Sequence, residues 1–224
     1  LTHPAAKVRP SHEAVPTHLS ASTVGQVFSQ LIRMTDGPAQ QQAKAWLLVR
    51  MQAWSEDVVR QHTLQVIRDL QQELASREQQ PVAELLNNSE RLNTFIQQLP
   101  VRVIASLLAL PPPQAQYAAT AIADFIRALA PGAAPDSEHS ELRIAMGNQA
   151  AQRLLAQLQA MHPQESSPRQ LANFIGLLMQ SYEATAGLIS NSLVALTQQQ
   201  LWQELRATPK LCPALVAEVA RFEP

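Results

Sequence analysis

Residues 169–199 read RQLANFIGLLMQSYEATAGLISNSLVALTQQ, the longest run in the sequence that fits a single helix. About thirty residues, rising about 1.5 Å each, give a helix of about 45 Å. Leucine, isoleucine, phenylalanine, methionine and valine lie on nearly every face of this helix, and a helix that is apolar all round is buried along its length. We therefore expect a long, buried central helix around which the other elements pack.

The middle of this run is polar. Residues 180–185 read QSYEAT and lie between Gly176 and Gly187. A buried polar group raises the free energy of the folded state unless it is hydrogen-bonded. This polar belt therefore needs either partners on a neighbouring helix or a functional role, and for Glu183 both explanations stay open at this point.

The composition favours helices over sheets. Hydrophobic residues make up 46% of the 224 residues, aromatic residues only 4%, and there are 6 glycines. Alanine, leucine and glutamine are frequent and have good helix propensity, whereas strands are enriched in β-branched and aromatic residues. We predict an all-α fold with minimal β structure, in which the 16 prolines separate the helices.

Charge and cysteine content exclude several kinds of partner and site. With 17 basic and 18 acidic residues the chain carries no electrostatic footprint for nucleic acid, and no apolar stretch is long enough to cross a membrane. The single cysteine, Cys212, excludes an internal disulfide framework, and we expect a buried thiol in a cytoplasmic protein. His3, His12 and His18 have spacings that suit no short metal-ligand motif, so no metal site is predicted.

Proline, glycine and capping residues divide the rest of the chain into helices. We predict one helical domain over residues 1–224, with an extended lead-in over 1–21 and a helical core over 22–224. Pro100 is expected to interrupt the helix in which it lies, and Asp36 to cap a helix that has Pro38 in its first turn. The predicted helices cover residues 22–33, 36–54, 55–77, 82–86, 89–110, 114–130, 137–161, 169–199, 201–206 and 212–224.

Three segments together resemble bacterial cytochromes P450, the haem-thiolate monooxygenases. Residues 180–185 resemble the part of that family's central helix that crosses the oxygen-binding face of the haem. Residues 99–111, LPVRVIASLLALP, resemble the family's fifth-helix signature, and residues 215–224, LVAEVARFEP, resemble its Glu-x-x-Arg helix. The order and spacing of the three segments fit the family over most of the chain.

The resemblance implies haem as cofactor, a redox partner that supplies electrons, and monooxygenation of a small organic substrate. It also assigns roles to particular residues. Glu183, Ala184 and Thr185 take the catalytic positions, Gln40, Lys44, Gln180 and Ser181 take the cofactor-binding positions, and Glu218 and Arg221 form a buried structural charge pair.

Several positions depart from the family's pattern. The chain ends at Pro224, inside the Glu-x-x-Arg helix, so the loop with the haem-ligating cysteine is absent from it. Gln40 and Lys44 stand where the family usually offers histidine and arginine to the haem propionates. The relay position after the acid is Ala184, and a threonine one residue later is rotated by about 100° on a helix. We therefore expect no haem bound through a thiolate and no catalysis by this chain alone.

Three functional hypotheses remain open. The chain is a truncated monooxygenase, or a degenerate helical relative that acts as a binding or accessory protein through protein–protein or ligand contacts, or an unrelated helical bundle. The sequence offers no other catalytic motif, such as G-x-S-x-G, H-E-x-x-H or a P-loop. Because an incomplete scaffold exposes apolar surface, we also predict self-association.

Overall fold

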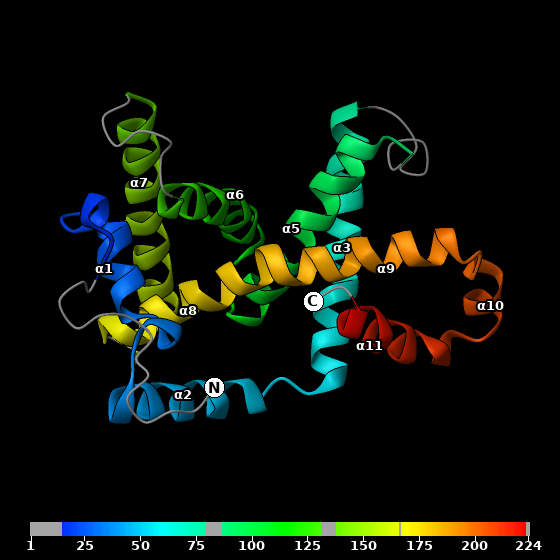
Figure 1. The fold of residues 1–224 in the computed structure, drawn as a ribbon, viewed down its shortest axis with the longest axis horizontal. Coiled ribbons are helices and arrows are strands. Elements are labelled where there is room, and N and C mark those ends of the chain that lie inside the picture. Colours follow the sequence, from blue (N-terminus) through cyan, green and yellow to red (C-terminus); the bar gives the residue numbers. More distant parts are fainter. Residues whose placement is uncertain (1–14, 79–86, 131–137, 166, 223–224) are drawn as a thin grey trace.

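The computed structural model describes residues 15–78, 87–130, 138–165 and 167–222, and every regular element in these ranges is helical (Figure 1). The all-α prediction is therefore confirmed. The predicted helix over 82–86 lies outside the described residues, as do residues 131–135, which the sequence leaves between two predicted helices. Of the predicted lead-in, residues 17–19 form a short 3₁₀ turn with Leu19 fully buried, so this part is not extended.

Local capping chemistry sets the helix ends near the N-terminus. Helix α1 spans Thr23–Gln30, and the Ser22 hydroxyl accepts a hydrogen bond of 2.9 Å from the Gly25 amide. After the 3₁₀ turn η2 (Ile32–Met34), helix α2 spans Gly37–Gln52. Asp36 occupies the predicted N-cap position, but its side chain makes no capping hydrogen bond.

The next four helices form most of the body. They are α3 (Glu56–Glu78), α5 (Ser89–Leu107), α6 (Pro112–Leu129) and α7 (Glu138–Met161). Asn88 caps α5, because its side-chain oxygen accepts hydrogen bonds from the backbone amides of Glu90 and Arg91. The prediction that Pro100 interrupts this helix is wrong, since α5 runs through it and the proline is buried.

The central run is continuous but not uniform. Helix α8 (Pro168–Gln180) passes through a π-helical turn, η3 (Ser181–Thr185), into α9 (Ala186–Gln198). Helix α8 is buried as predicted, whereas Val194 on α9 is 52% exposed. The expectation of burial along the whole helix is therefore wrong for its second half. Helices α10 (Trp202–Ala207) and α11 (Cys212–Phe222), linked by the 3₁₀ turn η4 (Pro209–Leu211), then turn back toward α9.

The main hydrophobic core lies between α1, α5, α6, α7 and α8. Its largest fully buried side chains include Phe125, Phe174, Leu154 and Ile175. A smaller cluster of Val66, Leu70 and Val103 joins α3 to α5. Among the described helices, none is long and apolar enough to cross a bilayer.

Candidate functional site

A groove runs where α2 and η2 lie against the second half of α8. Its larger hollow has a volume of about 380 Å³. Most of its wall is apolar, and it contains two cations but no acidic residue. The lining residues are Leu31, Ile32, Arg33, Gln40, Lys44, Leu47, Leu48, Asn173, Gly176, Leu177, Met179 and Gln180.

A second, smaller hollow of about 280 Å³ adjoins the first along the π-helical turn. The two share Arg33, Met179 and Gln180, and the second also carries the only acid of the combined lining, Glu183. Its remaining walls are Ile126, Leu129, Ala130 and Ala184. We refer to the two hollows together as the groove.

The turn at residues 35–38 brings α2 alongside α8. Gly37 has a φ of +68°, a left-handed conformation that glycine adopts without steric strain. Residues four apart lie on the same face of a helix, so Gln40 and Lys44 both face the groove. Gln40 also donates a weak hydrogen bond of 3.4 Å to the Ile32 carbonyl. The two positions predicted to bind a cofactor therefore share one site.

The π-helical turn explains the polar belt in the central run. Ser181 is buried, and its hydroxyl donates to the Leu178 carbonyl at 2.7 Å. Glu183, Ala184 and Thr185 are exposed. The belt therefore lies mostly at the surface, where Gln180, Glu183 and Thr185 are solvated, and the one buried hydroxyl, that of Ser181, is satisfied within its own helix.

The predicted site residues separate into two groups. Gln40, Lys44 and Gln180 line the larger hollow, and Glu183 and Ala184 line the smaller one. Ser181 points into the protein instead, and Thr185 belongs to neither lining. The structure thus assembles five of the seven positions along one groove, and their chemical roles stay predictions.

The sequence did not indicate that Arg33 and the leucines of the apolar wall belong to the site. Arg33 lies in η2 and is shared by both hollows, with its guanidinium 5.9 Å from the centre of the Phe28 ring. Leu47 and Leu48 on α2 were assigned no functional role. The available signal for Arg33 was a cation three residues before Asp36 of the Asp36-Gly37 turn.

The predicted buried charge pair is exposed. Arg221 donates to Glu218 at 2.7 Å and 3.2 Å, and this hydrogen bonding lowers the pKa of the Glu218 carboxyl. Both side chains are more than half exposed. The prediction of burial is therefore wrong, because α11 presents this face to solvent.

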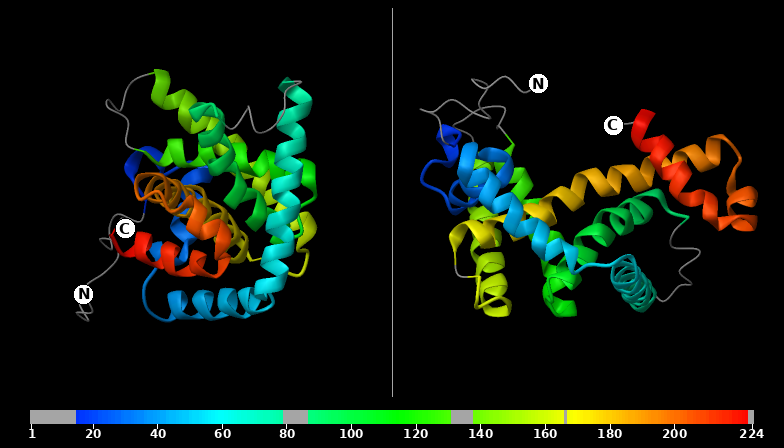
Figure 2. Two further views of the ribbon diagram at one scale, coloured as in Figure 1. Left: turned by 90° about the vertical axis from the view of Figure 1, so that its right-hand side faces the viewer. Right: turned by 90° about the horizontal axis from the view of Figure 1, so that it is seen from below.

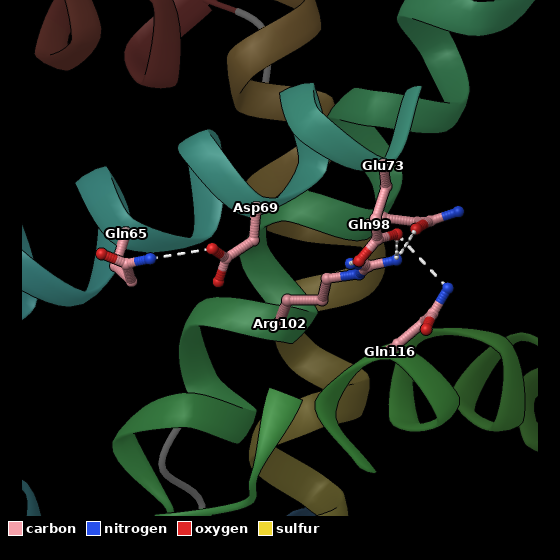
Figure 3. A network of polar contacts seen from close by, with 6 residues as sticks. All are labelled: Gln65, Asp69, Glu73, Gln98, Arg102 and Gln116. Carbon is pink, nitrogen blue, oxygen red and sulfur yellow. Dashed lines mark hydrogen bonds and ion pairs between the residues drawn. The ribbon is translucent and has the colours of Figure 1, made fainter. Parts of the chain in front are cut away.

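A different ion pair lies in the body of the molecule (Figure 3), with its arginine buried and its carboxylate partner, Glu73, 33% exposed. Arg102 on α5 donates to both carboxylate oxygens of Glu73 on α3, at 2.7 Å and 3.0 Å. It also donates to Gln98 at 2.7 Å, while Gln116 on α6 donates to Glu73 at 3.3 Å. The Arg102 side chain is only 6% exposed. This network joins three helices and lies outside the groove.

The groove does not fit a haem iron. Among the described residues that line it, none is a cysteine or a histidine. Cys212 is exposed at the first residue of α11, so the prediction of a buried thiol is wrong. Within the described ranges, no group of three or more His, Cys, Asp or Glu side chains is arranged to hold a metal ion.

Comparison with known proteins identifies a shared fold but does not identify a family. No family model and no curated protein matches the sequence. A chain of the crystal structure of P450BioI, in complex with acyl carrier protein ligated to hexadec-9Z-enoic acid, superposes with a TM-score of 0.63 and 19% sequence identity. The match covers 97% of this chain, which spans 57% of the length of that neighbour.

These findings correct the predicted family. At 19% identity the structural likeness shows a shared fold alone, and no family model supports membership among the cytochromes P450. We therefore withdraw that assignment, together with the haem- and iron-dependent monooxygenase function and the redox partner that it implied. The alternative of a helical binding or accessory protein agrees better with the structure and the comparisons.

Proposed function

We propose that this chain is a helical binding protein whose groove holds an amphiphilic anion, such as a carboxylate on an acyl chain. One observation carries the proposal: the larger hollow combines a leucine-rich wall with Arg33 and Lys44 and contains no acidic side chain. Ligand sites are typically apolar clefts of roughly 300–1,000 Å³ with a few polar groups that orient the ligand. The hollow has both properties.

The two cations are available to a ligand. Both Arg33 and Lys44 are exposed, and neither belongs to an ion pair among the described residues. An arginine fork and a lysine ammonium are the usual partners of a carboxylate. The acyl chain would lie against Leu47, Leu48 and Leu177, where burial of its methylene groups contributes the binding free energy.

The solved structure that shares the fold adds support from outside the chain. P450BioI is seen there with a carrier protein that bears a fatty acid, so an acyl chain is a ligand that a protein of this fold encounters. We also propose the cytoplasm as the location, since the single cysteine forms no disulfide within the chain.

Calorimetric titration with sodium dodecanoate tests the proposal, with dodecylammonium chloride and dodecan-1-ol as probes of the same length. We expect one dodecanoate per chain and weaker binding of the other two. The double variant Arg33→Gln/Lys44→Gln should weaken dodecanoate binding by roughly tenfold or more, since two charge-assisted contacts are lost.

The matched control is Arg206→Gln/Lys210→Gln, which removes two exposed cations outside the groove and should leave the affinity unchanged. Equal binding of dodecanoate and dodecylammonium would contradict a cationic site. Equal loss of affinity in the two double variants would also contradict it, because the effect would then follow net charge.

A further inference from the structure

A second cavity lies at the start of α8, apart from the groove. Its volume is about 470 Å³, and of the described residues Asn173 alone lines both sites. Helix α2 crosses α8 here, as the view from below in Figure 2 shows. Gln42 and Trp46 line the cavity, whereas Gln40 and Lys44 line the groove. Positions two residues apart differ by about 200° around a helix, so α2 has one site on each side.

The cavity is lined mainly by polar side chains and by one aromatic ring. Arg169 is the single charged residue among the described residues of its wall, and none of these is acidic. The acid nearest to Arg169 in the sequence, Glu165, forms an ion pair with Arg50 instead. The hydrogen-bonding side chains of the wall are Gln30, Gln42, Ser167, Arg169, Gln170 and Asn173. This lining suits a polar anion, unlike the leucine-rich wall of the groove.

Two walls of the cavity are fixed by packing and hydrogen bonds. Asn173 is 4% exposed, and its side-chain oxygen accepts the Ile32 amide at 2.8 Å. Its side-chain nitrogen donates to the carbonyls of Gln30 and Arg169, at 3.1 Å and 2.8 Å. The Trp46 ring lies 5.3 Å from the ring of Phe174, which is buried. A site whose walls are already ordered loses less entropy when a ligand binds.

The cavity also contains hydrogen-bond donors that the described part of the chain does not use. The Arg169 Nε donates to the Gln30 side-chain oxygen at 3.4 Å, and the terminal nitrogens of that guanidinium make no hydrogen bond within the described residues. The same is true of the Trp46 indole N–H and the Gln42 amide there. Arginine and tryptophan side chains donate hydrogen bonds and accept none. These groups therefore favour a ligand that accepts hydrogen bonds.

We propose that this cavity binds a small planar aromatic carboxylate. The carboxylate accepts two hydrogen bonds from the free edge of the Arg169 guanidinium, which matches its geometry. The aromatic ring packs against Trp46, an arrangement that stabilises a pair of rings beyond their burial alone. The volume lies within the range of roughly 300–1,000 Å³ that is typical of ligand sites. The proposal is independent of the acyl carboxylate proposed for the groove.

Fluorescence quenching tests this proposal, because Trp46 is one of three tryptophans and Trp54→Phe/Trp202→Phe leaves it as the sole emitter. The probes are 4-nitrobenzoate, whose ring quenches tryptophan on contact, and 4-nitrobenzyl alcohol, which has the same ring without the charge. We expect 4-nitrobenzoate to quench Trp46 saturably, with an affinity at least roughly tenfold higher than that of the alcohol. Circular dichroism checks that this and every other variant is folded.

Variants of Arg169 in the same background test its role. Arg169→Gln should weaken 4-nitrobenzoate binding by roughly tenfold and leave the affinity for the alcohol unchanged, because only the charged contact is lost. Arg169→Lys should lose less, since it keeps the charge without the two-pronged geometry. The matched control is Arg206→Gln on α10, which removes an exposed cation outside the cavity and should leave the affinity for 4-nitrobenzoate unchanged.

Three results would overturn the proposal. The first is quenching that does not saturate, and the second is equal affinity for the acid and the alcohol. The third is a loss of 4-nitrobenzoate binding in Arg33→Gln/Lys44→Gln as large as that in Arg169→Gln, which would place the aromatic acid in the groove. None of these measurements uses dodecanoate, so failure of this cavity is distinguishable from failure of the groove.

Discussion

Gly25, in the first turn of α1, lies directly against the turn that precedes it. A Cβ at this position would overlap the Leu19 carbonyl oxygen and would also crowd Val15. The obstacle is mainly backbone, which cannot move aside as a flexible side chain can. Gly187, at the start of α9, is the opposite case, since nothing lies within 4 Å of the Cβ position.

The two glycines therefore predict opposite effects of the same substitution. Gly25→Ala should destabilise the fold by about 2 kcal/mol or more, because the overlap forces α1 away from residues 15–19. Gly187→Ala should stabilise it by about 0.5–1 kcal/mol, because an exposed helical glycine loses more backbone entropy than alanine on folding. Urea denaturation measures both, and a tolerated Gly25→Ala would contradict the described packing.

The helix starts predicted at residues 22 and 169 were correct to within one residue because the decisive chemistry there is local, whereas the side chain of Asp36 makes no capping hydrogen bond. Ser22 at the start of α1 and Pro168 at the start of α8 act within one turn of their own position. Cys212 and Glu218 were predicted to be buried and are exposed. Their burial depends on what packs against α11, and a single chain segment carries no information about that.

At the scale of elements, the hydrogen-bond network around the buried Arg102 guanidinium links α3, α5 and α6. The Arg102 guanidinium is held by carboxylate and amide oxygens from α3 and α5, and Gln116 of α6 contacts the same carboxylate. Removing one partner of a buried ion pair leaves a charge without compensation, which is more harmful than removing the whole pair.

Glu73→Ala should therefore destabilise the protein by about 3 kcal/mol, which lowers Tm by roughly 6–12 °C for a chain of this length. Glu218→Ala removes a carboxylate of an exposed pair and should leave Tm unchanged within error. The double variant Glu73→Leu/Arg102→Met should recover much of the loss. Equal Tm shifts for Glu73→Ala and Glu218→Ala would contradict the difference in burial.

Most elements were predictable because apolar spacing and helix-ending residues act along the chain. The exception is Pro100, where the sequence indicates a break and α5 continues. Proline removes one helical hydrogen bond and strains the preceding turn, but packing against α3 and α6 holds the helix together on both sides. Tertiary contacts therefore outweigh the local preference there.

At the scale of the molecule, the body and the C-terminal helices α10 and α11 differ in how they are stabilised. The main core contains residues from α1, α5, α6, α7 and α8 and none from α10 or α11. Regions with few buried contacts open more easily than the core. The sequence did not reveal this contrast, because the apolar pattern of α9 and α11 is the same as that of a buried helix.

Hydrogen exchange should separate the two regions. Amides of α10 and α11 should exchange faster than those of α6–α8 by more than roughly tenfold, because no residue of α10 or α11 belongs to the main core. Mass spectrometry of peptic fragments measures both. Uniform protection across all of these helices would mean that α10 and α11 share the stability of the core.

The candidate site was predictable only in part. Gln40, Lys44 and Gln180 came from a resemblance between sequences, and the fold does bring them into one groove. Arg33 and the leucine wall face them only because α2 crosses α8 at that point. Such a crossing depends on the packing of whole helices, which no local pattern in the sequence specifies.

The π-helical turn at residues 181–185 has a consequence for how this protein could change by insertion or deletion. A π turn contains one residue more than an α-helical turn would need to close its hydrogen bonds. Loss of a single codon there would let the run continue as an unbroken α-helix with α9 in nearly the same orientation, because the wide turn already accommodates the extra residue. The same deletion within α8 or α9 would instead rotate every following residue by about 100°, so this turn is the place in the central run where the loss of one residue disturbs the packing least.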